Sequence, residues 1–313
     1  MRVVVGLDGS GPSEVARQFV ASIGWPMGTQ FVFVTAYGGR PRPHADAASV
    51  GWFHAANEST PRPDLLDELD IMAEPLRKAG YVVEVRVEPG HAGQVLRELA
   101  AEGAADLLVV GSHGHGPAAS AILGSVSAEL VDHAVCPVLV ARSPRVSRVM
   151  VATDGSASAV AIPAVLARWG ILRGLPVDVL SVAQRTLAAN DYLVTAWASP
   201  TEMGRPADDE VTQRHQHFVD NMVDDLANAG FPATGLVRHG DPAREILAGA
   251  REIQDDLIIT GSRGLGDLQR IMIGSVAHHV LLHSPSSVLI MRGHVPARIT
   301  ERAAVAVGSL SAS

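Results

Sequence analysis

Short aliphatic runs alternate with longer stretches of helical periodicity along most of the chain. In the first half, the aliphatic runs predict strands at 2–7, 30–36, 81–87, 106–110 and 137–141. The stretches between them carry apolar residues at helical spacing and predict helices at 13–22, 64–79, 91–102 and 125–133. This alternation predicts an α/β fold with right-handed crossovers, in which a mostly parallel five-stranded sheet is doubly wound, with helices on both faces.

The same order of elements occurs twice. Residues 2–10 (RVVVGLDGS) recur at 148–156 (RVMVATDGS), and residues 106–114 (DLLVVGSHG) recur at 256–264 (DLIITGSRG). In the second half, strands are predicted at 148–153, 176–183, 233–238, 256–260 and 287–292. A repeat of this length indicates a duplicated domain, because solenoid repeats are much shorter. We therefore expect tandem domains at 1–143 and 146–293, followed by a disordered tail at 294–313.

Composition narrows the class of protein. The 313 residues suit two domains, and 47% of them are hydrophobic, which is enough for two cores. Only 4% are aromatic, so the cores must consist of aliphatic residues, as in parallel sheets covered by helices. The net charge of −8 gives no general attraction to nucleic acid or to anionic membranes. The single cysteine, Cys136, lies in an apolar run and suits a core position in a reducing compartment. We expect a cytoplasmic protein without a leader or membrane span.

Two long segments interrupt the regular unit, at 38–63 and 184–207, each after the second strand of its half. Both are rich in Gly, Pro and Ala. They are predicted to be loops near the carboxyl ends of the strands, where such sheets bind ligands. Lids over a site and insertions without function are both compatible with this composition.

A glycine spacing after the fourth strand is the strongest chemical signal. Gly111-x-x-Gly114, nine residues and Gly124-Ser125 form the first copy, and Gly261-x-x-Gly264, nine residues and Gly274-Ser275 form the second. Glycine lets the backbone turn sharply and approach a ligand. The helix start offers N–H groups and a positive dipole end to phosphate, and a serine there can cap the helix or donate to the ligand. The spacing predicts two phosphate-binding loops; a purely structural turn is the alternative.

An acidic residue ends the first strand of each half, Asp8 in the first and Asp154 in the second. The first and fourth strands are expected to flank the point where strand order reverses, which is where doubly wound sheets bind ligands. Asp8 would then lie beside Gly111 and accept hydrogen bonds from ribose hydroxyls. The alternative is that Asp8 is only the N-cap of the following helix.

With these motifs the chain resembles the tandem-domain universal stress proteins of the ATP-binding branch, over roughly residues 1–292. The resemblance implies ATP in each half, adenine recognition by backbone at the end of the second strand, and homodimerisation. It also implies a role in stress response or growth control. Our leading hypothesis is that ATP occupancy shifts the conformation or assembly of the protein and that an unidentified protein partner reads this change. In the first half it implies a site at Gly6, Asp8, Ala36, Gly111, Ser112, His113, Gly114, Gly124, Ser125 and Val126. In the second half it implies a site at Ala152, Asp154, Val182, Gly261, Ser262, Arg263, Gly264, Gly266, Gly274, Ser275 and Val276.

Other residues carry weaker signals. His113-x-His115 has no further pair of ligands at metal-binding spacing, so no metal site made of protein alone is predicted. A Mg²⁺ ion could still accompany the phosphates, bound partly by Asp8 or water. His215 and His217 lie on different faces of a predicted helix and are interpreted as solvated. The last strand of each half should be a sheet edge, and the two edges could pair within the chain.

Several enzyme classes are disfavoured. The chain has no G-x-x-x-x-G-K-[ST] motif and no G-x-G-x-x-G after the first strand of either half. No nucleophile with a paired base emerges near the glycine loops, so slow ATP hydrolysis at most is expected. Three interpretations stay open: a regulatory ATP-binding module, an enzyme that cleaves ATP between its α- and β-phosphates, and a scaffold with degenerate sites.

The two predicted sites differ in several residues: Ala152 replaces Gly6, Val182 replaces Ala36 and, in the phosphate loop, Arg263 replaces His113. Arginine stays charged at any ordinary pH, whereas histidine is mostly neutral near neutrality. We predict that the first site binds ATP more weakly and with more pH dependence. ATP titrations of Asp8→Ala and Asp154→Ala proteins, each retaining one site, test this between about pH 6 and 8. Equal affinities that do not change with pH would contradict it.

Overall fold

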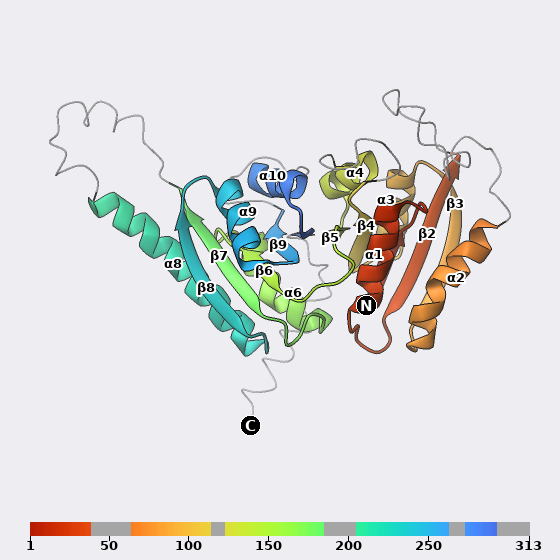
Figure 1. The fold of residues 1–313 in the computed structure, drawn as a ribbon, viewed down its shortest axis with the longest axis horizontal. Helices are drawn as coiled ribbons and strands as arrows, with labels where there is room; N and C mark the ends of the chain where they lie inside the picture. The colour runs from red at the N-terminus through yellow and green to blue at the C-terminus, as the bar shows by residue number, and fades with distance from the viewer. Residues whose placement is uncertain (39–63, 114–122, 185–204, 263–272, 293–313) are drawn as a thin grey trace.

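The computed structural model describes residues 1–38, 64–113, 123–184, 205–262 and 273–292 (Figure 1). The first half runs through β1 (Arg2–Gly6), α1 (Gly11–Ser22), β2 (Gln30–Gly38), α2 (Leu65–Lys78), β3 (Val82–Gly90), α3 (Ala92–Glu102), β4 (Leu107–Gly111), α4 (Ser125–His133) and β5 (Val138–Ala141). The second half runs through β6 (Val149–Ala152), α5 (Ala157–Val160), α6 (Ile162–Trp169), β7 (Val177–Ala183), α8 (Arg205–Asn228), β8 (Ala233–His239), α9 (Pro242–Ile253), β9 (Leu257–Gly261), α10 (Ser275–His283) and β10 (Ser287–Met291).

The strands form one ten-stranded sheet in the order β3-β2-β1-β4-β5-β10-β9-β6-β7-β8. Strands pair in parallel within each half, whereas β5 and β10 pair antiparallel, with Val140 opposite Val288. Strand order reverses between β1 and β4 in the first half and between β6 and β9 in the second. The predicted fold class is therefore confirmed, and so is the predicted pairing of the two last strands.

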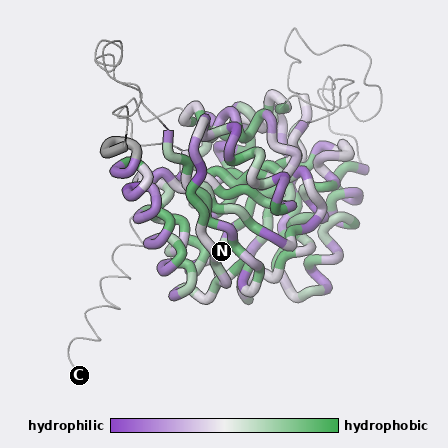
Figure 2. The backbone as a smooth tube through the Cα atoms, turned by 60° about the vertical axis from the view of Figure 1, so that its left-hand side comes forward, coloured by the Kyte–Doolittle hydropathy of each residue, from purple (hydrophilic) through white to green (hydrophobic). Residues whose placement is uncertain are grey.

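Alternating strand residues build a core on each face of this sheet. Val3 and Val5 face one core, which is completed by α1, α2, α6 and α8. Val4 faces the other core, which is completed by α3, α4, α9 and α10. Both cores include residues of both halves, and Figure 2 shows apolar residues concentrated along the sheet with polar residues on the outer helices. Cys136 is buried in the second of these cores, where burial raises the pKa of its thiol to about 12.

Two elements differ from the predicted repeat. The first helix of the second half is divided into α5 and α6, and Pro163 stands in the first turn of α6, where its missing N–H costs little. Helix α8 begins at Arg205, inside the segment predicted to be a loop up to residue 207, so that boundary was wrong. Most of the two predicted loops and the predicted tail lie outside the described residues. Among the helices that the structure describes, none is long and apolar enough to cross a membrane.

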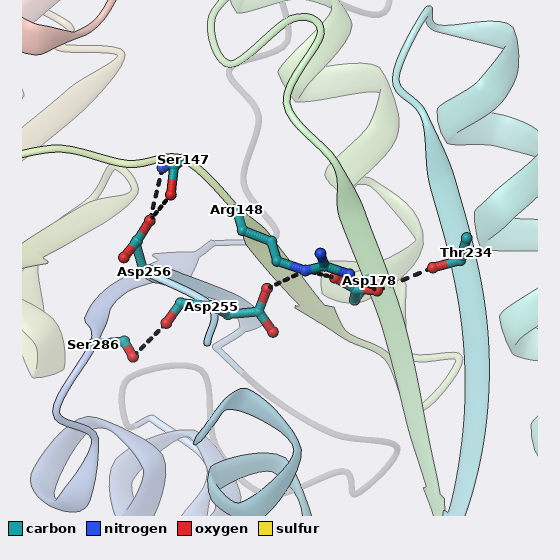
Figure 3. Close-up of polar contacts among 7 residues, drawn as sticks. All are labelled: Ser147, Arg148, Asp178, Thr234, Asp255, Asp256 and Ser286. Carbon is teal, nitrogen blue, oxygen red and sulfur yellow. Dashed lines mark hydrogen bonds and ion pairs between the residues drawn. The ribbon is translucent and has the colours of Figure 1, made fainter. Parts of the chain in front are cut away.

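A buried acidic cluster lies at the amino ends of β6, β7 and β9 (Figure 3). The Arg148 guanidinium pairs with the Asp178 carboxylate through Nε–Oδ2 and Nη2–Oδ1 distances of 2.6 and 3.1 Å. The same Nε lies 3.7 Å from Oδ1 of Asp255, whose side chain is fully buried. Thr234 donates a 3.0 Å hydrogen bond to Asp178. Burial, reinforced by the charge of Asp178, raises the pKa of Asp255 to about 7.

This raised pKa gives the stability of the protein a defined pH dependence. Because the folded state holds the Asp255 proton more tightly than the unfolded chain does, its stabilising contribution is greatest in acid. It is lost as pH rises through the folded pKa, at about 1.4 kcal/mol per pH unit between about pH 4 and 7. Urea unfolding should show this slope flattened in Asp255→Asn and kept in Asp224→Asn, which alters an exposed carboxylate on α8. An unchanged slope in Asp255→Asn would contradict the assignment.

Candidate functional site

The predicted site residues gather at the carboxyl ends of neighbouring strands. β1 and β4 are parallel neighbours with Val5 opposite Val109, so the chain leaves both strands at the same edge of the sheet. Asp8 follows β1 there, and Gly111 is the last residue of β4. The second half repeats the arrangement with Ala152 opposite Thr260, which brings Asp154 and Gly261 to equivalent positions.

Each acidic residue folds back onto the turn that follows it. Oδ1 of Asp8 accepts a 2.9 Å hydrogen bond from the backbone N–H of Ser10, and Asp154 accepts the same bond at 2.9 Å from Ser156. Ser10 is the N-cap of α1, so the interpretation of Asp8 as the helix N-cap was wrong. The glycine after each aspartate has a φ of +75°, in the left-handed region that favours glycine. The Asp-Gly-Ser sequence thus fixes a carboxylate at the strand end.

A side-chain hydroxyl on the neighbouring strand donates a hydrogen bond to the backbone carbonyl of the residue before each aspartate. Thr35 of β2 donates a 2.7 Å hydrogen bond to the carbonyl of Leu7, and Ser181 of β7 donates one of 2.6 Å to the carbonyl of Thr153. Sequence reasoning missed this pair, although a hydroxyl residue at equivalent positions in two aliphatic strands was an available signal. The carbonyl bonds hold both aspartate turns against the sheet.

The second half adds a histidine to this arrangement. His215 of α8 is half-buried, and its Nδ1 lies 2.8 Å from Oγ of Ser181. Because Ser181 already donates to a carbonyl, Nδ1–H is the donor in this bond. Burial, together with the nearby charge of Arg214, lowers the pKa of His215 and favours its neutral form. The expectation that His215 is solvated was therefore wrong, whereas His217 is exposed.

The first glycine of each motif makes room for a helix. A Cβ on Gly111 would lie 2.5 Å from the backbone carbon and oxygen of Pro12 in α1. A Cβ on Gly261 would collide with the Ser158 side chain of α5 and lie 3.2 Å from the Ala159 nitrogen. The missing side chains therefore face a packed helix, so helix packing is a reason for glycine at these positions that the sequence argument did not foresee. That the glycine backbone also approaches a ligand stays a prediction.

The Gly-Ser pair of each motif begins a helix, α4 in the first half and α10 in the second. The N–H of Gly124 donates to the Ser112 carbonyl at 2.8 Å, and that of Gly274 donates to the Ser262 carbonyl at 2.7 Å. In both helices this glycine is the N-cap, and no side-chain hydrogen bond caps the first turn among the described residues. Ser125, exposed at the first helical position, does not cap α4, contrary to one of its two expected roles. No side chain that the structure describes therefore competes with an anion for the first-turn N–H groups.

The remaining predicted residues that the structure describes lie in strands near their carboxyl ends, after β4, and in the first turns of α4 and α10. A Cβ on Gly6 would lie 2.7 Å from Leu96 Cδ1, so Gly6 packs against α3. His113 lies with Nδ1 2.9 Å from the Ser112 hydroxyl, and Val182 is buried whereas Ala36 is half-buried. The first-turn residues Val126 and Val276 pack partly buried on the core that faces α4 and α10. Gly114, Arg263, Gly264 and Gly266 lie outside the described residues.

This duplicated arrangement of strand ends and helix starts defines a class of α/β protein with a candidate site in each half. The model of the Universal stress protein family matches residues 1–142 and again residues 145–292. The chain belongs to the universal stress protein family.

Relatives extend over different parts of the chain. The universal stress protein YxiE of Bacillus subtilis is 31% identical over 147 residues, which are 47% of this chain and 99% of that protein. The universal stress protein MT2699 of Mycobacterium tuberculosis is 30% identical over 247 residues, or 74% of this chain and 81% of that one. The crystal structure of a universal stress protein from Archaeoglobus fulgidus superposes with a TM-score of 0.59 at 19% identity, covering 93% of this chain and 98% of that chain. This last likeness shows the shared fold.

The two glycine contacts predict unequal costs for the same substitution. In Gly111→Ala the new methyl group meets helix backbone, which cannot rotate away, so we expect a loss of about 1–3 kcal/mol in unfolding free energy. Gly261→Ala should cost less, because the nearest atom belongs to the rotatable Ser158 side chain. Denaturant unfolding measures both, and adding Ser158→Ala should restore stability to Gly261→Ala. Equal costs without restoration would show that packing at the two glycines is not as described.

Proposed function

We propose that the protein is an ATP-binding regulatory module with one site in each half, acting in stress response or growth control. The observation that carries the proposal is the meeting, in both halves, of a glycine-capped helix start with an acidic strand end at the reversal of strand order. Membership of the universal stress protein family supports a role of this kind. The same arrangement in two halves argues against a scaffold with degenerate sites.

In the proposed complex each part of the nucleotide meets a different element. Phosphate oxygens accept from first-turn N–H groups of α4 or α10, where the helix dipole is positive. Ribose hydroxyls donate to the carboxylate of Asp8 or Asp154, which the Asp-Gly-Ser turn holds at the strand end. Adenine lies against the backbone at Ala36 or Val182. A Mg²⁺ ion would supply further charge neutralisation to the phosphates.

We propose further that ATP acts by occupancy, with slow hydrolysis at most, and that a protein partner reads the occupied state. Each site offers hydrogen-bond donors and a carboxylate, which suit binding and not phosphoryl transfer. The protein is also proposed to form a homodimer. Since β5 and β10 each have strands on both sides, that dimer requires another surface.

The bound nucleotide identifies which of the three interpretations is right. We expect protein purified from its own cells to release intact ATP, identified by mass. Release of AMP with pyrophosphate would instead indicate an enzyme that cleaves between the α- and β-phosphates. No released nucleotide, together with no ATP uptake on titration, would indicate a scaffold and overturn the proposal.

A proline substitution tests the role of the helix starts directly. Ser125→Pro with Ser275→Pro removes one N–H from each helix at a position where proline is well tolerated. The extended ψ of Gly124, 151°, also suits a residue before proline. Calorimetry should show ATP affinity reduced about tenfold, because a charge-assisted hydrogen bond is lost.

The matched control is Ser125→Ala with Ser275→Ala, which removes the hydroxyls and keeps the N–H groups. A larger loss in the alanine protein would assign the binding to the hydroxyls. Thermal unfolding of both proteins checks that the helices remain folded. Unchanged ATP affinity in the proline protein would place the phosphates elsewhere.

A further inference from the structure

The residue after the last strand of each half is an arginine, Arg142 after β5 and Arg292 after β10. Both side chains are half-buried. The antiparallel pairing of β5 with β10 directs each arginine toward the opposite half. Neither arginine belongs to the sequence motifs that define the proposed nucleotide sites.

Each arginine reaches the last turn of a helix in the other half. Nη2 of Arg142 donates to the Leu281 carbonyl of α10 at 2.6 Å. Nη2 of Arg292 donates to the Val131 carbonyl of α4. Val131 and Leu281 are equivalent positions of the repeat, so the two contacts are related by the pseudo-two-fold symmetry of the chain. Figure 1 shows α4 and α10 next to each other at the middle of the molecule.

The chemistry of these contacts suits their position. Carbonyls of a last helical turn have no partner within the helix, and a cation is favourable at the negative end of the helix dipole. Charge-assisted hydrogen bonds are roughly twice as strong as neutral ones. Burial lowers the pKa of Arg142 to about 10, which leaves the guanidinium charged at neutral pH.

The junction between the halves, where β5 pairs with β10, has further hydrogen bonds that the repeat does not duplicate. Oγ of Ser287 accepts hydrogen bonds from the backbone N–H groups of Arg142 and Ser143, at 3.0 and 3.2 Å. The equivalent residue of the first half is Pro137, which has no side-chain hydroxyl. The arginine contacts are therefore the symmetric part of the junction, and the serine contacts are its asymmetric part.

The helices that receive these arginines are the ones that begin at the proposed phosphate sites. Helix α4 starts after Gly124 and accepts Arg292 in its last turn, and α10 starts after Gly274 and accepts Arg142. We propose that Arg292 and Arg142 are positioning residues for the nucleotide sites, each holding the phosphate helix of the opposite half. This inference rests on the proposed function. It makes each site dependent on the other half of the chain and couples the two sites through α4 and α10.

The crossed arrangement gives a crossed experimental signature. In nucleotide-free protein, Arg292→Ala should speed amide hydrogen exchange in α4 about tenfold and leave α10 unchanged, and Arg142→Ala should do the reverse. With the second site disabled by Asp154→Ala, Arg292→Ala should weaken ATP binding at the first site by about three- to tenfold in calorimetry. Arg292→Lys, which keeps the charge and one donor, should restore part of the loss.

Arg173→Ala provides the matched control. Arg173 is exposed and donates to the Ala167 carbonyl in the last turn of α6, within its own half, so neither α4 nor α10 should respond. Faster exchange in the helix of the same half, or equally in both helices, overturns the inference. If the wild-type protein binds no ATP, the proposed function fails, and the crossed exchange pattern still decides whether the arginines hold the opposite helices.

Discussion

The antiparallel hydrogen bonds between β5 and β10 turn two repeated halves into one sheet. Both strands are buried along their whole length, and each has a parallel neighbour of its own half on the other side. Cores on the two faces consequently continue from one half into the other. Without this pairing each half would expose an aliphatic strand edge, which is a hazard for aggregation.

The repeat is symmetric where the proposed sites lie and asymmetric around them. The aspartate turns, the strand hydroxyls and the glycine-capped helices occur in both halves. Among the described residues, only the second half places a histidine, His215, against its strand hydroxyl. The second half also has the buried Asp178 and Asp255 where the first half has Val32 and Ala105. A duplicated domain of this kind keeps its backbone geometry while its side chains diverge, so the two sites need not respond alike to pH.

Sequence patterns predicted the inner strands well because buried parallel strands are continuous aliphatic runs with little ambiguity. They also placed Asp8 beside Gly111, since parallel strands leave a sheet at the same edge. The sequence patterns failed where a residue's role depends on a contact with an element distant in the sequence. One reason for glycine at position 111 is the backbone of Pro12, and no local pattern tells that a helix approaches there. Asp255 and Asp256 are adjacent, yet only Asp255 is a buried acid; Asp256 binds the exposed Ser147.

The central position of β10 has a consequence for how the molecule is made. Among the described strands β10 is the last in chain order, but it occupies the middle of the sheet beside β5. During synthesis the first half therefore finishes its own strands long before its innermost edge can be covered. For that interval β5 is an open aliphatic edge on a nascent polypeptide, and a chain that terminated early, before residue 287, would leave it open permanently.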